Sequence, residues 1–177
     1  MFKSGLTERN ERLRDESEYN AFRSPSKVLD YDQAISKVKE ALSKWEPTSE
    51  TEAREIFEEV NKKYPDDYLP NEWWDTASKL IYRDFFVWGH DHDFGFGIQR
   101  KGSMSTRHIE ITSEAMSLGF LPISLDQKKV LNVGPWSGGD LLILAGLGGD
   151  CIALEEHPVA AAAAGYLTKK LGVETTV

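Results

Sequence analysis

Residues 131–140 contain a glycine-rich turn of the kind that follows a strand at a nucleotide-binding site. They read LNVGPWSGGD, with Gly134 and Gly138 on either side of Trp136. Gly134 permits a tight turn without a Cβ, and Gly138 allows the following helix to pack closely against the strand. A dinucleotide site has a further glycine between them, so that backbone N–H groups reach a pyrophosphate at the helix N-terminus. The indole of Trp136 stands in that place, and no lysine follows at P-loop spacing, so the sequence disfavours NAD, FAD and ATP.

An acidic residue at the end of the next expected strand supplies the second half of an adenosine site. Glu155 closes the run CIALE, and it follows Gly134 by about twenty residues, the spacing at which a ribose-binding acid is found. The two oxygens of one carboxylate can accept hydrogen bonds from both ribose hydroxyls. Glu156 is the weaker candidate, because adjacent strand residues point to opposite faces. A ligand with an adenosine but no phosphates fits both features, and we expect S-adenosylmethionine (SAM).

Histidines and carboxylates crowd the segment 87–108, which reads VWGHDHDFGFGIQRKGSMSTRH. His90, His92 and His108 are the candidates for a general base near neutral pH. A metal site is the competing interpretation, because histidine with carboxylate suits zinc or non-haem iron. No cysteine lies close by to complete a zinc site, and no β-barrel pattern surrounds the histidines, so we expect no metal.

The same segment has the composition of a lid over a ligand. Trp88 and Phe94 would cover the cofactor, while Gly95 and Gly97 would give the backbone its freedom to move. A glycine-rich connector whose histidines are buried and hydrogen-bonded explains the composition equally well.

Composition excludes several classes of protein. Hydrophobic residues make up 40% and charged residues 28% of the 177 residues, as in globular proteins. A net charge of −8 disfavours a duplex-binding protein, which usually has a dominant basic face. Cys151 is the only cysteine, so no intramolecular disulfide can form. The first residues lack the apolar core of a signal peptide, and no apolar run reaches membrane-spanning length. We therefore expect a soluble, cytoplasmic protein.

Hydrophobic periodicity divides the chain into three parts. Residues 1–86 are expected to be a helical region, and residues 87–128 the Gly- and His-rich loop with a short helix. Residues 129–177 alternate strand and helix, which predicts an α/β fold with a parallel sheet built from βαβ units. The expected helices cover 32–45, 49–63, 72–86, 112–118, 140–147 and a stretch that opens at 157–158, and the expected strands cover 129–133 and 151–156.

The run VLNVGPWSGGDLLILAGLGGDCIALEE resembles motifs I and II of the class I SAM-dependent methyltransferases. Two positions depart from the usual pattern. Asn132 stands where the family has Asp or Glu, and Trp136 replaces the middle glycine. The upstream segment 87–108 is loosely similar to the one that precedes motif I in the branch of the tRNA wobble-uridine methyltransferases.

The resemblance implies a Rossmann-like fold and a methyltransferase function with SAM as cofactor. Glu155 would hold the ribose and Trp88 would lie at the cofactor. The residues that would line the cofactor are Gly134, Pro135, Trp136, Ser137 and Gly138. The family's sheet is longer than this chain can supply, so we expect an amino-terminal, apparently truncated portion of the enzyme.

The chain would then self-associate or pair with a partner chain that completes the sheet. The methyl acceptor is a small molecule or an RNA, and no membrane is expected to take part. Two other functions stay open: a non-catalytic SAM-binding or interaction module with a degenerate motif I, and a metal-dependent enzyme that uses the histidine segment.

Overall fold

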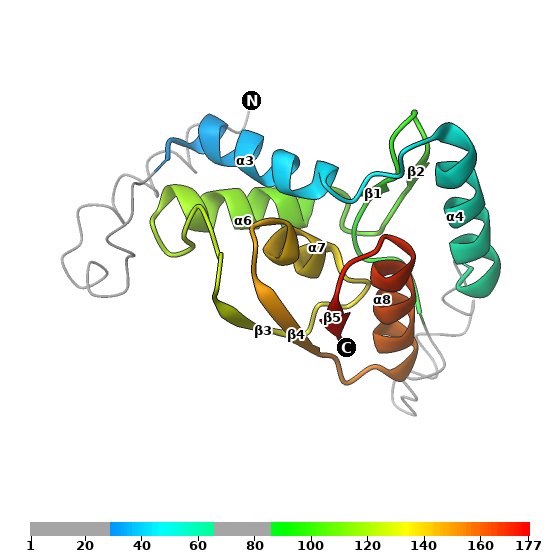
Figure 1. Ribbon diagram of the computed structural model, residues 1–177. Helices are drawn as coiled ribbons and strands as arrows, with labels where there is room; N and C mark the ends of the chain where they lie inside the picture. Colours follow the sequence, from blue (N-terminus) through cyan, green and yellow to red (C-terminus); the bar gives the residue numbers. More distant parts are fainter. Residues whose placement is uncertain (1–28, 66–85) are drawn as a thin grey trace.

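The computed structural model describes residues 29–65 and 86–177 (Figure 1). Within these residues the chain forms helices and two small sheets. The helices are α3 (Tyr31–Ser43), α4 (Glu50–Lys63), α6 (Arg107–Ser117), α7 (Gly139–Gly146) and α8 (Pro158–Lys170), and the strands are β1 (His92–Asp93), β2 (Gln99–Arg100), β3 (Lys129–Val133), β4 (Asp150–Leu154) and β5 (Thr175–Thr176). The helix expected over 72–86 lies outside the described residues except for Phe86, which is not helical.

The larger sheet is parallel, with the strand order β3-β4-β5. Lys129 pairs with Asp150 and Val133 with Leu154, so β3 and β4 match along their whole length. Because α7 and α8 connect successive strands of a sheet whose order follows the chain, the elements form two consecutive βαβ units. The expected α/β class and parallel sheet are confirmed.

Both connecting helices pack on one face of this sheet (Figure 1). Side chains alternate along β3 and β4, so that Val130, Cys151 and Ala153 face the helices and contact Leu141 and Leu144 of α7. α3 and α6 lie side by side beyond α7, farther from the sheet. The helices therefore form two layers above one face of the sheet.

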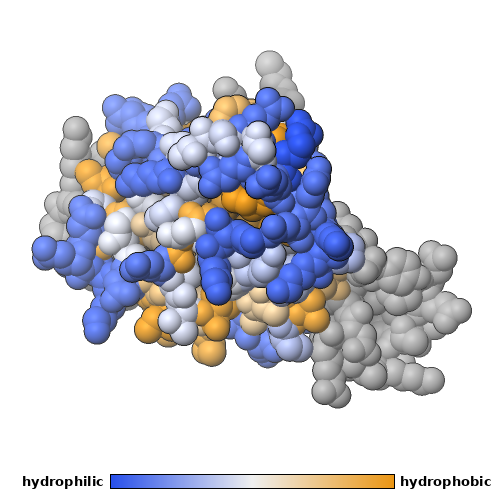
Figure 2. Space-filling model, turned by 45° about the vertical axis from the view of Figure 1, so that its right-hand side comes forward, coloured by the Kyte–Doolittle hydropathy of each residue, from blue (hydrophilic) through white to orange (hydrophobic). Residues whose placement is uncertain are grey.

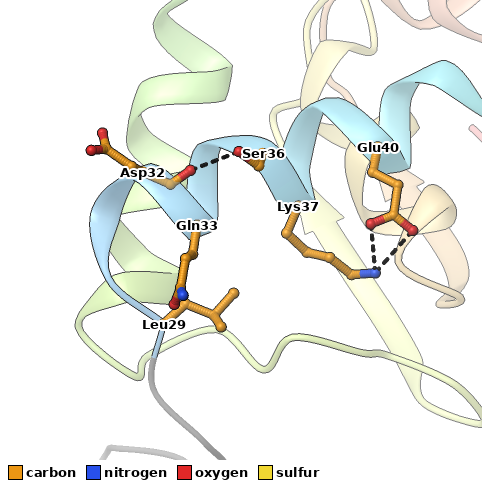
Figure 3. A pocket seen from close by; sticks show the side chains of 6 residues that line it. All are labelled: Leu29, Asp32, Gln33, Ser36, Lys37 and Glu40. Carbon is orange, nitrogen blue, oxygen red and sulfur yellow. Dashed lines mark hydrogen bonds and ion pairs between the residues drawn. The ribbon is translucent and has the colours of Figure 1, made fainter.

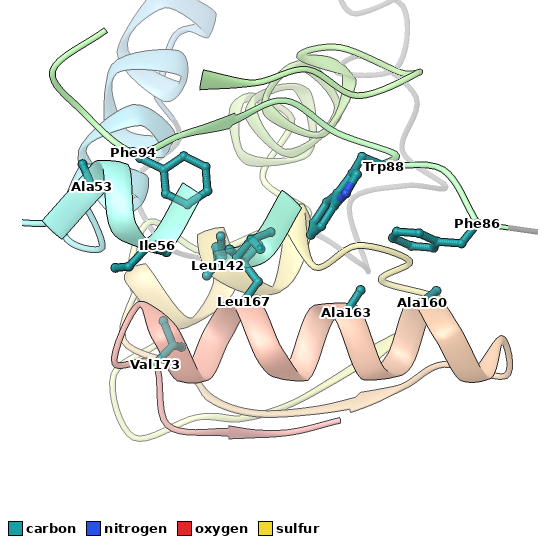
Figure 4. Close-up of a cluster of buried hydrophobic side chains, with 11 residues drawn as sticks. Ala53, Ile56, Phe86, Trp88, Phe94, Leu142, Ala160, Ala163, Leu167 and Val173 are labelled. Carbon is teal, nitrogen blue, oxygen red and sulfur yellow. The ribbon is translucent and has the colours of Figure 1, made fainter. Parts of the chain in front are cut away.

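The N-terminal helices α3 and α4 complete the core above α7 and α8. Ser49 caps α4 by accepting a hydrogen bond from the backbone N–H of Glu52. Ala53 and Ile56 of α4 join Leu142 of α7 and Leu167 of α8 in one buried cluster (Figure 4). The helical region thus shares its core with the βαβ units.

The helix expected to begin at Thr112 begins at Arg107 instead. Its buried face is made mostly of polar or small side chains, among them His108, Thr112 and Ser113. This face carries no apolar stripe, so hydrophobic periodicity does not detect the first turn of the helix. His108 consequently lies on a helix and not in the preceding loop.

Gly146 allows α3 and α7 to cross at close range. A Cβ at this position would lie 2.2 Å from the carbonyl oxygen of Ala41. Because that oxygen belongs to the backbone of a packed helix, it cannot move aside without displacing α3. The close approach also lets Lys44 donate a hydrogen bond to the Gly146 carbonyl oxygen at 2.6 Å.

We expect Gly146→Ala to lower the free energy of unfolding by about 2 kcal/mol, because overpacking outweighs the better helix propensity of alanine. Gly165→Ala is the matched control, because a Cβ there meets only Val177 at 3.7 Å. The control should be neutral or stabilising by about 0.5–1 kcal/mol. Chemical denaturation measures both, and equal effects of the two substitutions would contradict the close crossing.

Candidate functional site

The turn between β3 and α7 has a left-handed backbone at three alternate residues. Gly134 has φ +73°, Trp136 has φ +49° and Gly138 has φ +91°. Trp136 therefore keeps the conformation that a glycine would adopt in its place, although a non-glycine residue there costs about 1–2 kcal/mol. The turn therefore has a backbone that favours glycine at its middle position, although a tryptophan stands there.

Contacts of the indole hold Trp136 in this strained conformation. Its Nε1 donates a hydrogen bond to the carbonyl oxygen of Val87 at 2.6 Å. The ring stacks on Phe86, with centroids 6.0 Å apart, and lies 4.9 Å from the ring of His157. The indole is thus a fixed part of the wall beside the turn, and the exclusion of a pyrophosphate stays a prediction.

Glu155 lies directly after β4 and reaches the turn that follows β3. Its Oε2 accepts a hydrogen bond from the backbone N–H of Trp136 at 2.8 Å, and its Oε1 accepts one from the N–H of His157 at 2.9 Å. The carboxylate therefore joins the loops at the ends of two neighbouring strands. Each oxygen has a further lone pair with which to accept another hydrogen bond. Glu155 is half-buried, whereas Glu156 is exposed.

The residues expected to line the cofactor differ in exposure. Gly134 is exposed and Trp136 is half-buried, whereas Pro135, Ser137 and Gly138 are buried. The Ser137 hydroxyl accepts a hydrogen bond from the N–H of Gly89 at 3.2 Å. Glycine is favoured at 138 by its φ of +91° and by its close approach to α8, where a Cβ would lie 3.3 Å from the Cβ of Ala164; no atom of the strand lies within 4 Å of that Cβ.

Asn132 lies on the helix-facing side of β3, where the methyltransferase motif that the sequence resembles has an acid. Its side-chain nitrogen Nδ2 is buried and has no hydrogen-bond partner within residues 29–65 and 86–177. A carboxylate at this position would present only acceptors, whereas the amide adds a donor. Asn132 therefore places a hydrogen-bond donor beneath the turn, where a carboxylate would offer acceptors alone.

Two of the three candidate histidines meet at the first turn of α7. The rings of His90 and His108 are 4.5 Å apart, and a Cβ on Gly139 would lie 2.7 Å from Nδ1 of His90. His92 packs edge-on against Trp88, with centroids 5.4 Å apart. All three histidines are at least nine-tenths buried, and each has a ring nitrogen without a partner in the described part of the chain.

Burial keeps these histidines neutral. It lowers the pKa of His92 to about 3, with the nearby His108, His90 and Arg100 acting in the same direction. Burial, followed by repulsion from His90, lowers the pKa of His108 to about 4. The pKa of His90 is lowered by burial and partly restored by Asp140 and Asp91. A histidine with a pKa this far below 7 is a weak general base, and their catalytic role stays a prediction.

The segment expected to be a lid is largely packed into the protein. Trp88 and Phe94 are each 1% exposed and belong to the same core cluster (Figure 4). Nε1 of Trp88 donates a hydrogen bond to the carbonyl oxygen of Tyr64. β1 and β2 pair as a short antiparallel hairpin. Among the aromatic residues of this segment only Phe96, 56% exposed, presents a large apolar surface to solvent.

Two hollows in the described surface lie away from the turn. One, of about 380 Å³, is lined by α3, the hairpin and the start of α6, and includes Asp91, His92 and Lys101 but neither Glu155 nor residues 134–138. The other, of about 460 Å³, runs along the outer face of α3, where Lys37 and Glu40 form an ion pair (Figure 3). Neither hollow contains the residues expected to bind the cofactor.

No group of three or more His, Cys, Asp or Glu side chains is placed to hold a metal ion in the part of the chain that the structure describes. Among the same residues, no helix is both long and apolar enough to cross a bilayer. Comparison with models of protein families, with curated proteins and with solved structures finds no match to this chain.

The lowered histidine pKa values predict that the fold loses stability in mild acid. Unfolding returns the pKa of His108 from about 4 to its ordinary value of 6.5. Between pH 6.5 and pH 4 the unfolded chain therefore binds a proton at His108 that the folded chain does not, and folding is disfavoured as the pH falls. The contribution of His108 to the free energy of unfolding should fall by about 2 kcal/mol from pH 7 to pH 5.

Denaturation of wild type and of His108→Gln at both pH values measures this contribution. The variant should lose less stability on acidification, because glutamine does not titrate. Arg107→Gln, at an exposed position on the same helix, is the control and should follow the wild type. Parallel pH dependence in all three proteins would show that His108 does not carry the effect.

Proposed function

We propose that this chain binds S-adenosylmethionine in the turn after β3 of its Rossmann-like βαβ units and acts in SAM-dependent methyl transfer. The observation that carries the proposal is the position of Glu155. Its carboxylate lies at the carboxyl end of a parallel sheet, where ligands of βαβ folds bind, and contacts the backbone of the adjacent turn at 2.8 Å.

Glu155 is suited to hold a ribose in this position. The two backbone N–H donors fix the carboxylate in place, and its remaining lone pairs can accept hydrogen bonds from the two ribose hydroxyls. A group that is held before the ligand arrives loses little conformational entropy on binding. The exposed Gly134 leaves the neighbouring backbone accessible to the same ligand.

Methyl transfer asks mainly for alignment of the acceptor with the sulfonium group of the cofactor. His90 and His108 meet at the first turn of α7, directly after the turn that follows β3. Their low pKa values fit an acceptor that needs only a neutral hydrogen-bonding group and no strong base. The acceptor is a small molecule or an RNA.

A non-catalytic SAM-binding or interaction module is the second candidate, favoured by Asn132. Its unpartnered Nδ2 lies where the family has an acid, and loss of that acid is compatible with a turn that binds the cofactor but does not support transfer. An assay of methyl transfer from SAM to added RNA or small-molecule acceptors distinguishes the two functions, because only the methyltransferase would form a methylated product.

Calorimetric titration with different cofactors tests which of them the chain binds. We expect S-adenosylmethionine or its product S-adenosylhomocysteine to bind at least about tenfold more tightly than NAD, because Trp136 stands in place of the glycine that brings backbone N–H groups close to a pyrophosphate. Equal affinities for NAD and the SAM product would contradict the proposal.

Substitution of Glu155 tests whether its carboxylate holds the ribose. Glu155→Ala should weaken binding of the SAM product by about 1–3 kcal/mol, because the ribose hydroxyls lose their acceptor. Glu156→Ala is the control, because Glu156 is the next residue but is exposed, and its affinity should be unchanged. Thermal unfolding of each variant separates a ligand effect from loss of the turn, and unchanged affinity in a folded Glu155→Ala protein would assign the ribose to another group.

A further inference from the structure

β3 and β4 present four large apolar side chains on the face of the sheet that α7 and α8 leave open. Leu131, Val133, Ile152 and Leu154 are exposed by 64%, 68%, 52% and 61%. Hydrophobic surface gathers along the lower edge in Figure 2, where Figure 1 places the sheet. Parallel sheets are normally covered on both faces, and a contiguous apolar patch marks an interaction site. We call these four residues the open-face patch.

A charged pair closes one end of the open-face patch. Lys129 and Asp150 are paired across β3 and β4, and both are exposed. Because side chains alternate along a strand, they lie on the same face as Leu131 and Ile152. The face therefore has three successive rows: Lys129 with Asp150, Leu131 with Ile152, and Val133 with Leu154.

We propose that the open-face patch is a homodimer interface, in which the sheet packs face to face against the sheet of a second copy. The two-fold axis of this dimer runs parallel to the strands, midway between the two sheets and opposite the gap between β3 and β4. Rotation about this axis places β3 of one copy opposite β4 of the other, and each row of one sheet faces the same row of the other. Leu131 then faces Ile152 of the second copy, and Val133 faces Leu154. Lys129 faces Asp150 of the second copy, and the same contact occurs twice.

Charge selects this axis over the alternative. A two-fold axis across the strands would reverse one sheet and place Lys129 and Asp150 over the apolar row of Val133 and Leu154. That arrangement would bury both charges under apolar side chains, where each has only its neighbour in the same chain as a partner. The axis along the strands matches apolar rows with apolar rows and each cation with an anion, so the face is complementary to itself. This self-complementarity identifies the occupant as a second copy, and it does not rest on the proposed function.

Sedimentation equilibrium of the full chain tests the dimer. The wild type should show a monomer–dimer equilibrium, and Val133→Asp should be monomeric because it places a charge in the middle of the apolar rows. Lys129→Asp and Asp150→Lys should each weaken the dimer by about tenfold, because every cross-copy pair becomes a repulsion.

Mixing the two charge variants distinguishes the interface from effects within one chain. In an equimolar mixture, the aspartate introduced at position 129 of one copy faces the lysine introduced at position 150 of the other. The second contact pairs the two unchanged side chains, so heterodimers should form with close to wild-type affinity. Repulsion or misfolding inside one chain cannot be relieved by mixing.

A second pair of charge reversals serves as the control. Lys37→Asp and Glu40→Lys reverse an exposed pair on α3 and should leave the equilibrium unchanged, alone or mixed. A monomeric wild type, assembly beyond the dimer, or a mixture no tighter than its components would overturn the proposal.

Discussion

The carboxylate of Glu155 connects the two loops on which the candidate site depends. It accepts one backbone hydrogen bond from Trp136, in the turn after β3, and one from His157, in the loop after β4. His157 in turn caps α8, through a hydrogen bond from the N–H of Ala160 to its ring Nδ1 at 3.1 Å. One side chain thus connects the carboxyl ends of β3 and β4 to the start of α8. A ligand bound to Glu155 would therefore contact the group that links these three parts of the fold.

The turn itself is held from the other side by the segment 86–89. The indole of Trp136 donates to Val87 and stacks on Phe86, while Ser137 accepts from Gly89. These contacts offset the cost of a bulky residue at positive φ. They also explain how the chain can dispense with the middle glycine of the usual turn: the conformation is enforced by tertiary contacts, and no longer by the intrinsic freedom of a glycine.

Local sequence signals predict the elements that follow simple rules. Apolar runs and turn residues, which act over a few positions, predict the strand at 129–133, the helix over 49–63 and the helix that opens with Pro158. The place of Glu155 at the end of β4 follows from the same periodicity. The class of the fold is therefore accessible from the sequence.

Features that depend on distant partners are not accessible in this way. The direction of the Trp136 indole is set by Val87, 49 residues away, and Trp88 is buried by contacts with Tyr64 and α4. The early start of α6 escapes detection because its buried face is polar. The open-face patch cannot be foreseen either, because the run KVLNV predicts a strand but does not tell which of its faces is covered.

The central claim is that Glu155 holds the ribose of the cofactor. The most direct test removes the ribose hydroxyls from the ligand and the carboxylate from the protein, first separately and then together. Calorimetry would compare S-adenosylhomocysteine with its 2′,3′-dideoxyribose analogue on the wild type and on Glu155→Ala. We predict that removal of the hydroxyls weakens binding to the wild type by about tenfold but leaves binding to the variant unchanged, because the two changes remove the same hydrogen bonds. An equal loss of affinity in both proteins would contradict the account.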